Sequence, residues 1–387
     1  MKKVWDKWTR IALVKRILVG LILGAILGIA VPQATGIAIL GDVFVSALKA
    51  IAPLLVFFLV ISSLCNAGKS HGGVIKTVII LYMFSTVLAA VIAVFASMAF
   101  PVKMTLANAA TDTSAPQGIV EVLNNLLLNV VANPVSSLVN ANYVGILMWA
   151  VLLGLAFRAA DKMTKKVLAD VADGISMVVT WIINLAPFGI FGLVFNTVST
   201  NGLDIFTTYG KLLLLLVGCM LFIYFVTNPL LVYWCIRQNP YPLIFHCLKR
   251  SALTAFFTRS SAANIPVNMK VCEEMGLDRD TYSVTIPLGA TINMDGAAIT
   301  ITVMTMATAF TLGIHVDIPT AIILSLLAAL SACGASGVAG GSLLLIPMAC
   351  SLFGISDDIS MQVVAVGFII GVVQDSVETA LNSSSDL

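Results

Sequence analysis

The sequence Asn293-Met294-Asp295-Gly296 interrupts an otherwise apolar segment, residues 286–311. The last apolar segment, residues 363–387, contains a second polar set: Asp375, Glu378, Thr379, Asn382 and Asp386. Acidic side chains inside a membrane-spanning helix are costly, so they usually mark an ion or substrate path. If the chain spans a membrane, these two stretches decide both its fold and its functional site.

Composition indicates a membrane protein. Of the 387 residues, 59% are apolar and 10% are charged, against roughly 25% charged in soluble domains. A spanning helix needs about 20 mostly apolar residues. Such stretches occur at residues 11–30, 44–63, 74–100, 143–157, 167–195 and 212–236. In the first of them, the four-residue spacing of Gly20, Gly24 and Gly28 predicts close contact with another helix. The net charge of only +2 gives no reason to expect a nucleic-acid partner, so the lipid bilayer is the expected surrounding.

Basic residues are concentrated in alternate loops, which predicts the orientation of the chain. They are Lys2, Lys3, Lys7, Arg10, Lys15 and Arg16, then Lys69 and Lys76, then Arg158, Lys162, Lys165 and Lys166, then Arg237, Lys249 and Arg250. The opposite loops contain Asp112, Glu121, Asp204, Asp317, Asp357 and Asp358. Because basic loops stay on the cytoplasmic side, we expect a cytoplasmic N-terminus.

Two further apolar segments, residues 258–266 and 334–342, are broken by small and polar residues. Helices do not run smoothly through such sequences, and freed backbone groups are tolerated in a membrane only beside protein or a water-filled cavity. We therefore expect two tips of helical hairpins that line a cavity. Each hairpin precedes one polar-interrupted span, and the loop charges place the two hairpins in opposite orientations. Such inverted repeats predict an all-α polytopic membrane protein of the secondary transporter class.

The polar residues of the two spans favour a cation and an amino acid as ligands. Asp375, Thr379, Asn382 and Asp386 share one helical face with Glu378, although for Thr379 alone a purely structural hydrogen bond between helices is equally plausible. The expected spans contain four acids, Asp295, Asp375, Glu378 and Asp386, but only one obvious intramembrane cation, Arg259. Oxygen ligands suit a hard cation. Sodium is favoured, with a proton as the rival. The tip amides at Ser260-Ser261 and Gly337-Val338 can meet a carboxylate, and Asp375 can meet an α-amino group.

Other classes of protein fit the sequence less well. A hydrolase needs a nucleophile with a base, but His71, His246 and His315 lie in or near separate loops away from the polar residues. The seven cysteines show no zinc-type spacing, so an enzyme is not expected. A channel also uses polar helices, yet opposed hairpins favour a gated carrier.

The chain resembles the dicarboxylate/amino acid:cation symporters, also called the glutamate transporter family. The resemblance rests on Arg259-Ser260-Ser261 with Pro266, on residues 287–296 ending in Asn-Met-Asp-Gly, on the glycine-rich second tip, and on Asp375, Thr379, Asn382 and Asp386. It implies a homotrimer with eight transmembrane helices plus two opposed re-entrant hairpins, located in the plasma membrane, the inner membrane of a bacterium. Residues 1–240 would be mainly scaffold. Residues 241–387, with the third span at 74–100, would form a transport domain that moves elevator-fashion.

The resemblance also implies the roles of particular residues, with sodium as the coupling ion and no organic cofactor. One sodium site would use the Asp386 carboxylate with carbonyls of Gly289, Asn293 and Asn382. A second would use Asp295 and Asn293 with Tyr82, Ser85 and Thr86, and a third would use carbonyls of Thr291 and of residues 332–335. The substrate would contact Arg259, Ser260, Ser261, Val338, Asp375, Glu378, Thr379 and Asn382.

Two departures from the family pattern bear on the substrate. Members that carry acidic substrates have an arginine where this chain has Glu378 and a threonine where it has Ala297. A carboxylate in that pocket would repel an acidic side chain but could accept a hydroxyl. Small neutral amino acids are therefore expected, as in the bacterial members that carry serine and threonine with sodium. A symporter of acidic amino acids or dicarboxylates, coupled to sodium or protons, is the alternative.

The sequence stops at Ser385-Asp386-Leu387, within the last expected span. A helix that ended there would leave carbonyl groups without partners at membrane depth. We therefore expect the sequence to be a truncated fragment.

Overall fold

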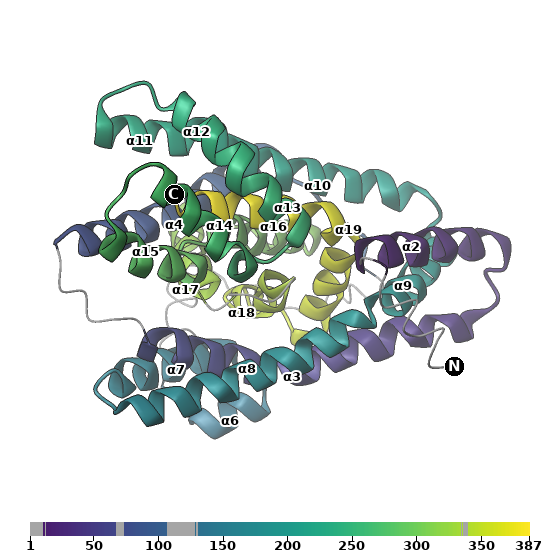
Figure 1. Ribbon diagram of the computed structural model, residues 1–387. Coiled ribbons are helices and arrows are strands. Elements are labelled where there is room, and N and C mark those ends of the chain that lie inside the picture. Colours follow the sequence, from purple (N-terminus) through teal and green to yellow (C-terminus); the bar gives the residue numbers. More distant parts are fainter. Residues whose placement is uncertain are drawn as a thin grey trace.

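A computed structural model describes residues 11, 13–66, 73–106, 128, 131–333, 335 and 340–387. In these residues all regular structure is helical. Six helical segments within the described part are long and apolar enough to cross a membrane. The expected all-α membrane protein is confirmed at this level. The figures show α16 (Asp295–Thr311) and α19 (Asp357–Ser384) between α10 (Asp204–Phe222) on one side and α3 (Ile39–Asn66) on the other (Figure 1).

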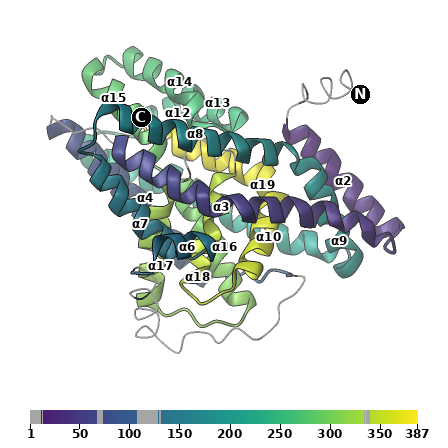
Figure 2. The same ribbon diagram turned by 90° about the horizontal axis from the view of Figure 1, so that it is seen from below.

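Helices from the first half of the chain pack against one another at the edge of this centre. α2 (Leu13–Ala30) lies along α9 (Ala186–Asn201), and η1 (Thr35–Ala38) leads into α3. α3 packs against α7 (Tyr143–Phe157) and lies side by side with α8 (Lys162–Asn184) (Figure 2), while the short α6 (Pro134–Val139) lies next to α7.

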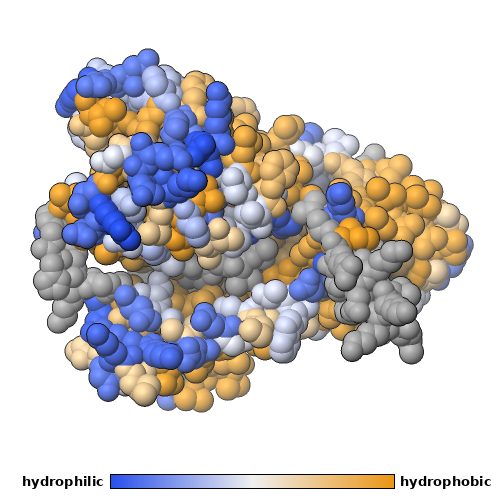
Figure 3. Space-filling view, viewed as in Figure 1, coloured by the Kyte–Doolittle hydropathy of each residue, from blue (hydrophilic) through white to orange (hydrophobic). Residues whose placement is uncertain are grey.

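Glycines allow α2 and α9 to approach closely, as their spacing predicts. A Cβ atom at Gly20 would lie 2.2 Å from the carbonyl oxygen of Pro187, and one at Gly24 would lie 2.6 Å from that of Phe191. The exposed faces of α2 and α3 are rich in large apolar residues, among them Ile22, Ile26, Ile29, Ile39 and Val43. This end of the molecule is correspondingly hydrophobic in Figure 3, as expected of a surface in contact with lipid.

The expected span at residues 167–195 is wrong, because the structure contains two helices there. α8 ends at Asn184 and α9 begins at Ala186. The cause is Pro187, which has no N–H to donate and whose ring clashes with the carbonyl four residues earlier. The proline is tolerated in the first turn of α9, so it starts a new helix that turns to pack along α2.

α10 continues through a π-helical turn, η2 (Ile223–Thr227), into α11 (Asn228–Ile236). The chain then continues through α12 (Tyr241–Cys247), η3 (Leu248–Ala252) and α13 (Leu253–Thr258). It reverses direction and continues as α14 (Ser261–Glu274). The reversal at Arg259 and Ser260 agrees with the expected first tip. Pro266 lies inside α14 rather than at the reversal.

The next segment is interrupted where the sequence predicts. α15 (Arg279–Ile292) and α16 are separated by Asn293 and Met294, neither of which is helical. α16 is buried from Asp295 to Ala309, and it packs against α4 (Gly73–Ala99) and α17 (Ile318–Ala332). α17 is the outgoing arm of the second predicted hairpin.

The returning arm of that hairpin begins with η4 (Gly341–Leu345) and α18 (Ile346–Ser351). Gly334 and residues 336–339, which include Gly337 and Val338, lie outside the described residues. The last segment agrees with the one-face spacing of its polar residues, because α19 runs unbroken for 28 residues through the polar set. No glycine or proline occurs between Val372 and Ser384, and the Thr379 hydroxyl donates to the carbonyl of Asp375 one turn earlier. The polar side chains therefore form a stripe on a continuous helix.

Candidate functional site

The buried carboxylate of Asp295 joins the start of α16 to α4. It accepts hydrogen bonds from the Ser85 hydroxyl at 2.8 Å and from the Thr86 hydroxyl at 3.2 Å. The backbone N–H of Met294 donates to the Thr86 oxygen at 3.2 Å. Asp295 is 0% exposed. The structure thus brings together Asp295, Ser85 and Thr86, as the resemblance implies.

A second buried carboxylate, that of Asp386, lies beside the break between α15 and α16. Its Oδ1 accepts from the Asn293 amide at 3.1 Å, and its backbone carbonyl accepts from the Tyr82 hydroxyl at 2.8 Å. Gly289 makes room for this carboxylate, since a Cβ there would lie 2.6 Å from Oδ1 of Asp386. A larger residue at position 289 would displace the acid.

Two oxygen atoms in this cluster lack hydrogen-bond partners among the described residues. They are Oδ1 of Asn293 and Oδ2 of Asp386, and both are buried. Buried acceptors are normally satisfied, so a pair of exceptions on neighbouring side chains calls for an explanation such as an ion. Amide and carboxylate oxygens are ligands of hard cations. In the described part of the chain, no group of three or more His, Cys, Asp or Glu side chains could hold a metal. The two oxygens without partners, an amide and a carboxylate oxygen, are of the type that a hard cation such as sodium takes as ligands.

The third predicted cation site is only partly described. The Thr291 hydroxyl donates to the carbonyl of Leu288 on its own helix at 2.8 Å. The end of α17 lies close by, with Cys333 Sγ 3.7 Å from the carbonyl oxygen of Ile292. The ends of α15 and α17 are therefore adjacent, which is the arrangement that shared carbonyl ligands would require.

The predicted substrate residues include an ion pair. Nη2 and Nε of Arg259 each lie 2.6 Å from Oδ2 of Asp375, and the backbone N–H of Gly340 donates to Oδ1 of Asp375 at 3.1 Å. Arg259 has a left-handed backbone conformation with φ of 53°, which is rare outside glycine and common at functional sites. The first hairpin tip, through Arg259, and the second hairpin, through Gly340, therefore both contact Asp375 of α19.

A cavity of only about 10 Å³ borders this ion pair, and Leu13, Ile17 and Ile183 line its other side. Such a space admits about one water molecule, so a bound amino acid requires movement of the Arg259 side chain or of these helices.

The other predicted substrate residues make hydrogen bonds or contacts within the protein. Asn382 Oδ1 accepts from the Gly296 N–H at 2.7 Å, and Ser260 caps α14 by accepting from the Ala263 N–H. Ser261 is buried in the first turn of α14.

Glu378 has partners that the sequence did not suggest. Its carboxylate accepts from Thr300 on α16, from Ser342 on η4 and from Gln374 one turn earlier on α19. Asn228 lines the same cavity as Ser85 and Asn293 without having been predicted. Gln374 could have been found, because a position four residues before a helical acid lies on the same face. Thr300 and Ser342 could not, since no local spacing links them to Glu378.

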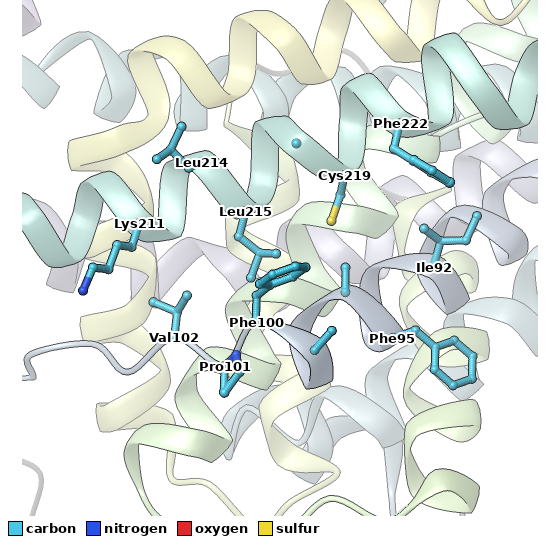
Figure 4. A pocket seen from close by; sticks show the side chains of 13 residues that line it. Ile92, Phe95, Phe100, Pro101, Val102, Lys211, Leu214, Leu215, Cys219 and Phe222 are labelled. Atoms are coloured by element: carbon cyan, nitrogen blue, oxygen red, sulfur yellow. The ribbon is translucent and has the colours of Figure 1, made fainter.

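Two larger cavities flank the described core. One has a volume of about 680 Å³ and borders the buried polar residues Tyr82, Ser85, Asn293 and Asp386. The other, about 860 Å³, lies between the end of α4 and α10 (Figure 4). Its lining is apolar except for Lys211 at one edge, so it lacks the polar groups that a hydrophilic ligand needs.

The chain is similar to known proteins over its whole length, including all residues of the site. A model of the sodium:dicarboxylate symporter family matches residues 13–387. A protein of Bifidobacterium adolescentis named serine/threonine transporter SstT is 58% identical over 388 residues, which cover 100% of this chain and 90% of that protein. Proteins of the same name from two strains of Streptococcus thermophilus are 55% and 56% identical, with 100% of this chain and 96% of each relative covered. Every predicted site residue lies within the matched region.

Proposed function

The chain belongs to the sodium:dicarboxylate symporter family, and from this premise we propose that it is a sodium-coupled symporter that imports serine and threonine. The observation that carries the proposal is full-length similarity, at 55–58% identity, to three proteins named serine/threonine transporters. It is a transporter and not an enzyme.

Sodium ions bind at the two buried acids beside the α15–α16 break. Asp386 and Asn293 contribute their oxygens to one site, with the carbonyls of Gly289 and Asn382. Asp295 contributes to the other with Tyr82, Ser85 and Thr86. The buried oxygens of Asn293 and Asp386 that lack hydrogen-bond partners among the described residues support this assignment. A third site uses carbonyls of Thr291 and of residues near the end of α17.

The amino acid binds between the two hairpin tips and α19. Its α-amino group pairs with Asp375 in place of the Arg259 guanidinium, so that Asp375 keeps a cationic partner. The displaced guanidinium must then move into water, because it would otherwise remain as a half-buried charge without a partner. Its carboxylate is held by backbone amides of the tips, at Ser260–Ser261 and at Val338. Thr379 and Asn382 complete the pocket.

Selectivity for neutral substrates arises at Glu378. A buried carboxylate next to the substrate side chain repels an acidic group and accepts a hydrogen bond from a hydroxyl. The family's description as sodium:dicarboxylate symporters favours the alternative, transport of acidic amino acids or dicarboxylates. Glu378 argues against that alternative.

Transport proceeds by an elevator motion in a homotrimer. The scaffold consists mainly of residues 1–240, and the mobile unit consists of residues 241–387 with α4. α4 packs more extensively against α16 and α17 than against α10 of the scaffold, which supports its place in the mobile unit. The expected location is the bacterial inner membrane with the N-terminus inside.

Uptake of labelled serine into liposomes that contain the purified protein tests the proposal. An inward sodium gradient is compared with a proton gradient alone, with excess threonine, alanine or aspartate as competitors. Sodium-dependent uptake that threonine blocks and aspartate does not is the expected result. Block by aspartate, or uptake driven by protons alone, would instead favour the alternative and remove the selective role of Glu378.

A further inference from the structure

Glu378 is held by three side chains from three different elements. Its Oε2 accepts from the Thr300 hydroxyl at 2.7 Å, from the Ser342 hydroxyl at 2.9 Å and from the Gln374 amide. Gln374 also donates to the Thr300 oxygen at 2.8 Å. All four side chains are buried, none more than 5% exposed. Glu378 therefore has a single fixed position in this conformation.

The three hydrogen bonds are distributed unevenly over the carboxylate. All three reach Oε2, one more than the roughly two lone-pair sites of a carboxylate oxygen, so Oε2 is a poor acceptor for any further donor. Among the described residues, nothing donates to Oε1. For a fourth donor, such as a ligand hydroxyl, Oε1 is therefore the better acceptor of the two.

The position of Glu378 relates this oxygen to the amino-acid site. Glu378 lies three residues after Asp375 on α19, so both acids lie on one helical face. The second hairpin contacts both of them, through the Gly340 N–H to Asp375 and the Ser342 hydroxyl to Glu378. On the α16 side, a Cβ at Gly296 would lie 2.9 Å from the Glu378 carbonyl oxygen, so that helix cannot move closer.

We propose that Thr300, Ser342 and Gln374 are positioning residues that hold Glu378 by Oε2 and reserve Oε1 for the hydroxyl of the substrate. The inference rests on the proposed function and extends it to the preference for hydroxyl-bearing amino acids. Loss of Thr300 or Gln374 removes one of the three donors to Oε2 and lets the carboxylate shift. The substrate hydroxyl then loses its fixed acceptor, whereas a substrate without a hydroxyl loses nothing.

The experiment compares serine with alanine, which differ by that hydroxyl. In liposomes with an inward sodium gradient, the KM for serine and the inhibition constant of alanine against serine are measured for Thr300→Val, Gln374→Leu and Ser342→Ala. The ratio of the alanine constant to the serine constant is expected to fall about tenfold, as for a lost hydrogen bond to a charged group. Thr300→Ser is expected to restore it.

Thr308→Val is the matched control, because Thr308 is equally buried on α16 and donates to the carbonyl of Met304 on its own helix. Its ratio is expected to stay at the wild-type value. An unchanged ratio in Thr300→Val and Gln374→Leu would overturn the inference, as would an equal loss for serine and alanine. Ser342→Ala, the smallest change, keeps the test available if the other variants do not fold. Absence of sodium-driven serine uptake by the wild-type protein would overturn the proposed function instead.

Discussion

The guanidinium of Arg259 and the carboxylate of Asp375 form an ion pair at 2.6 Å, with side chains 12% and 4% exposed. The two residues are 116 positions apart, and the pair joins the first tip to α19. Removal of one partner from such a buried pair costs several kcal/mol, because the other charge is left without compensation. A substrate that supplies its own cation to Asp375 avoids that cost for the carboxylate, provided that the displaced Arg259 guanidinium reaches water.

Asp375→Asn is expected to raise the KM for serine about 100-fold or more. The amide keeps the size of the side chain but cannot compensate the charge of the α-amino group, and truncation of a buried charge pair typically costs about 2–5 kcal/mol. Initial rates of serine uptake over a range of concentrations measure the effect. Asp358→Asn is the control, since its side chain lies on the same helix but is 86% exposed. A KM within twofold of the wild-type value would rule out Asp375 as the amine partner.

Asp295→Asn and Asp386→Asn are each expected to abolish the dependence of serine uptake on sodium. Each change removes a charged oxygen ligand from a buried site, and hard cations depend on such ligands. The measurement is uptake against external sodium concentration. Asp317→Asn serves as the control, because Asp317 caps α17 and asparagine caps a helix equally well. If both site variants kept the sodium dependence of the wild type, the cation assignment would be wrong.

Much of the site could be predicted because its chemistry is local in the sequence. The break at Asn293 follows from polar residues and a glycine in an apolar segment, and the reversal at Arg259–Ser260 follows from a similar interruption. Proximity of Asp295 to Ser85 and Thr86, more than 200 residues apart, was implied only by the family resemblance. Hydrophobic periodicity specifies which face of a helix is buried but not which helix covers it.

The errors have physical causes of the same kind. Residues 167–195 are apolar enough for one span, and only the effect of Pro187 on backbone geometry separates α8 from α9. The stripe from Asp375 to Asp386 was expected on one helical face, and α19 is continuous through it, but the spacing alone could not say which elements supply partners to its polar side chains. Glu378 has such partners in Thr300 and Ser342, which sequence spacing does not reveal.

Gly20→Ala is expected to destabilise the protein by about 1–3 kcal/mol, as overpacking does. The added methyl group would lie 2.2 Å from the carbonyl oxygen of Pro187, so α2 and α9 must separate. Thermal unfolding of the purified protein in detergent measures the change. Gly174→Ala in α8 is the control, because nothing lies within 4 Å of its Cβ position. Alanine is there expected to add up to about 1 kcal/mol of stability through helix propensity. Equal melting temperatures for both variants would contradict the packing argument.

Glu378→Arg is expected to weaken serine uptake and to admit aspartate. The change replaces the acceptor of the substrate hydroxyl with a cation that pairs with a side-chain carboxylate, and charge mismatch discriminates strongly between substrates. Uptake of labelled serine and labelled aspartate by wild type and variant measures the switch. Glu378→Gln is the matched control, because it removes the charge without supplying a cation, so it should relax the exclusion of aspartate but give slower aspartate uptake than Glu378→Arg. Preference for aspartate over serine in the wild type would refute the selective role of Glu378, because its carboxylate would then face an acidic side chain that it should repel.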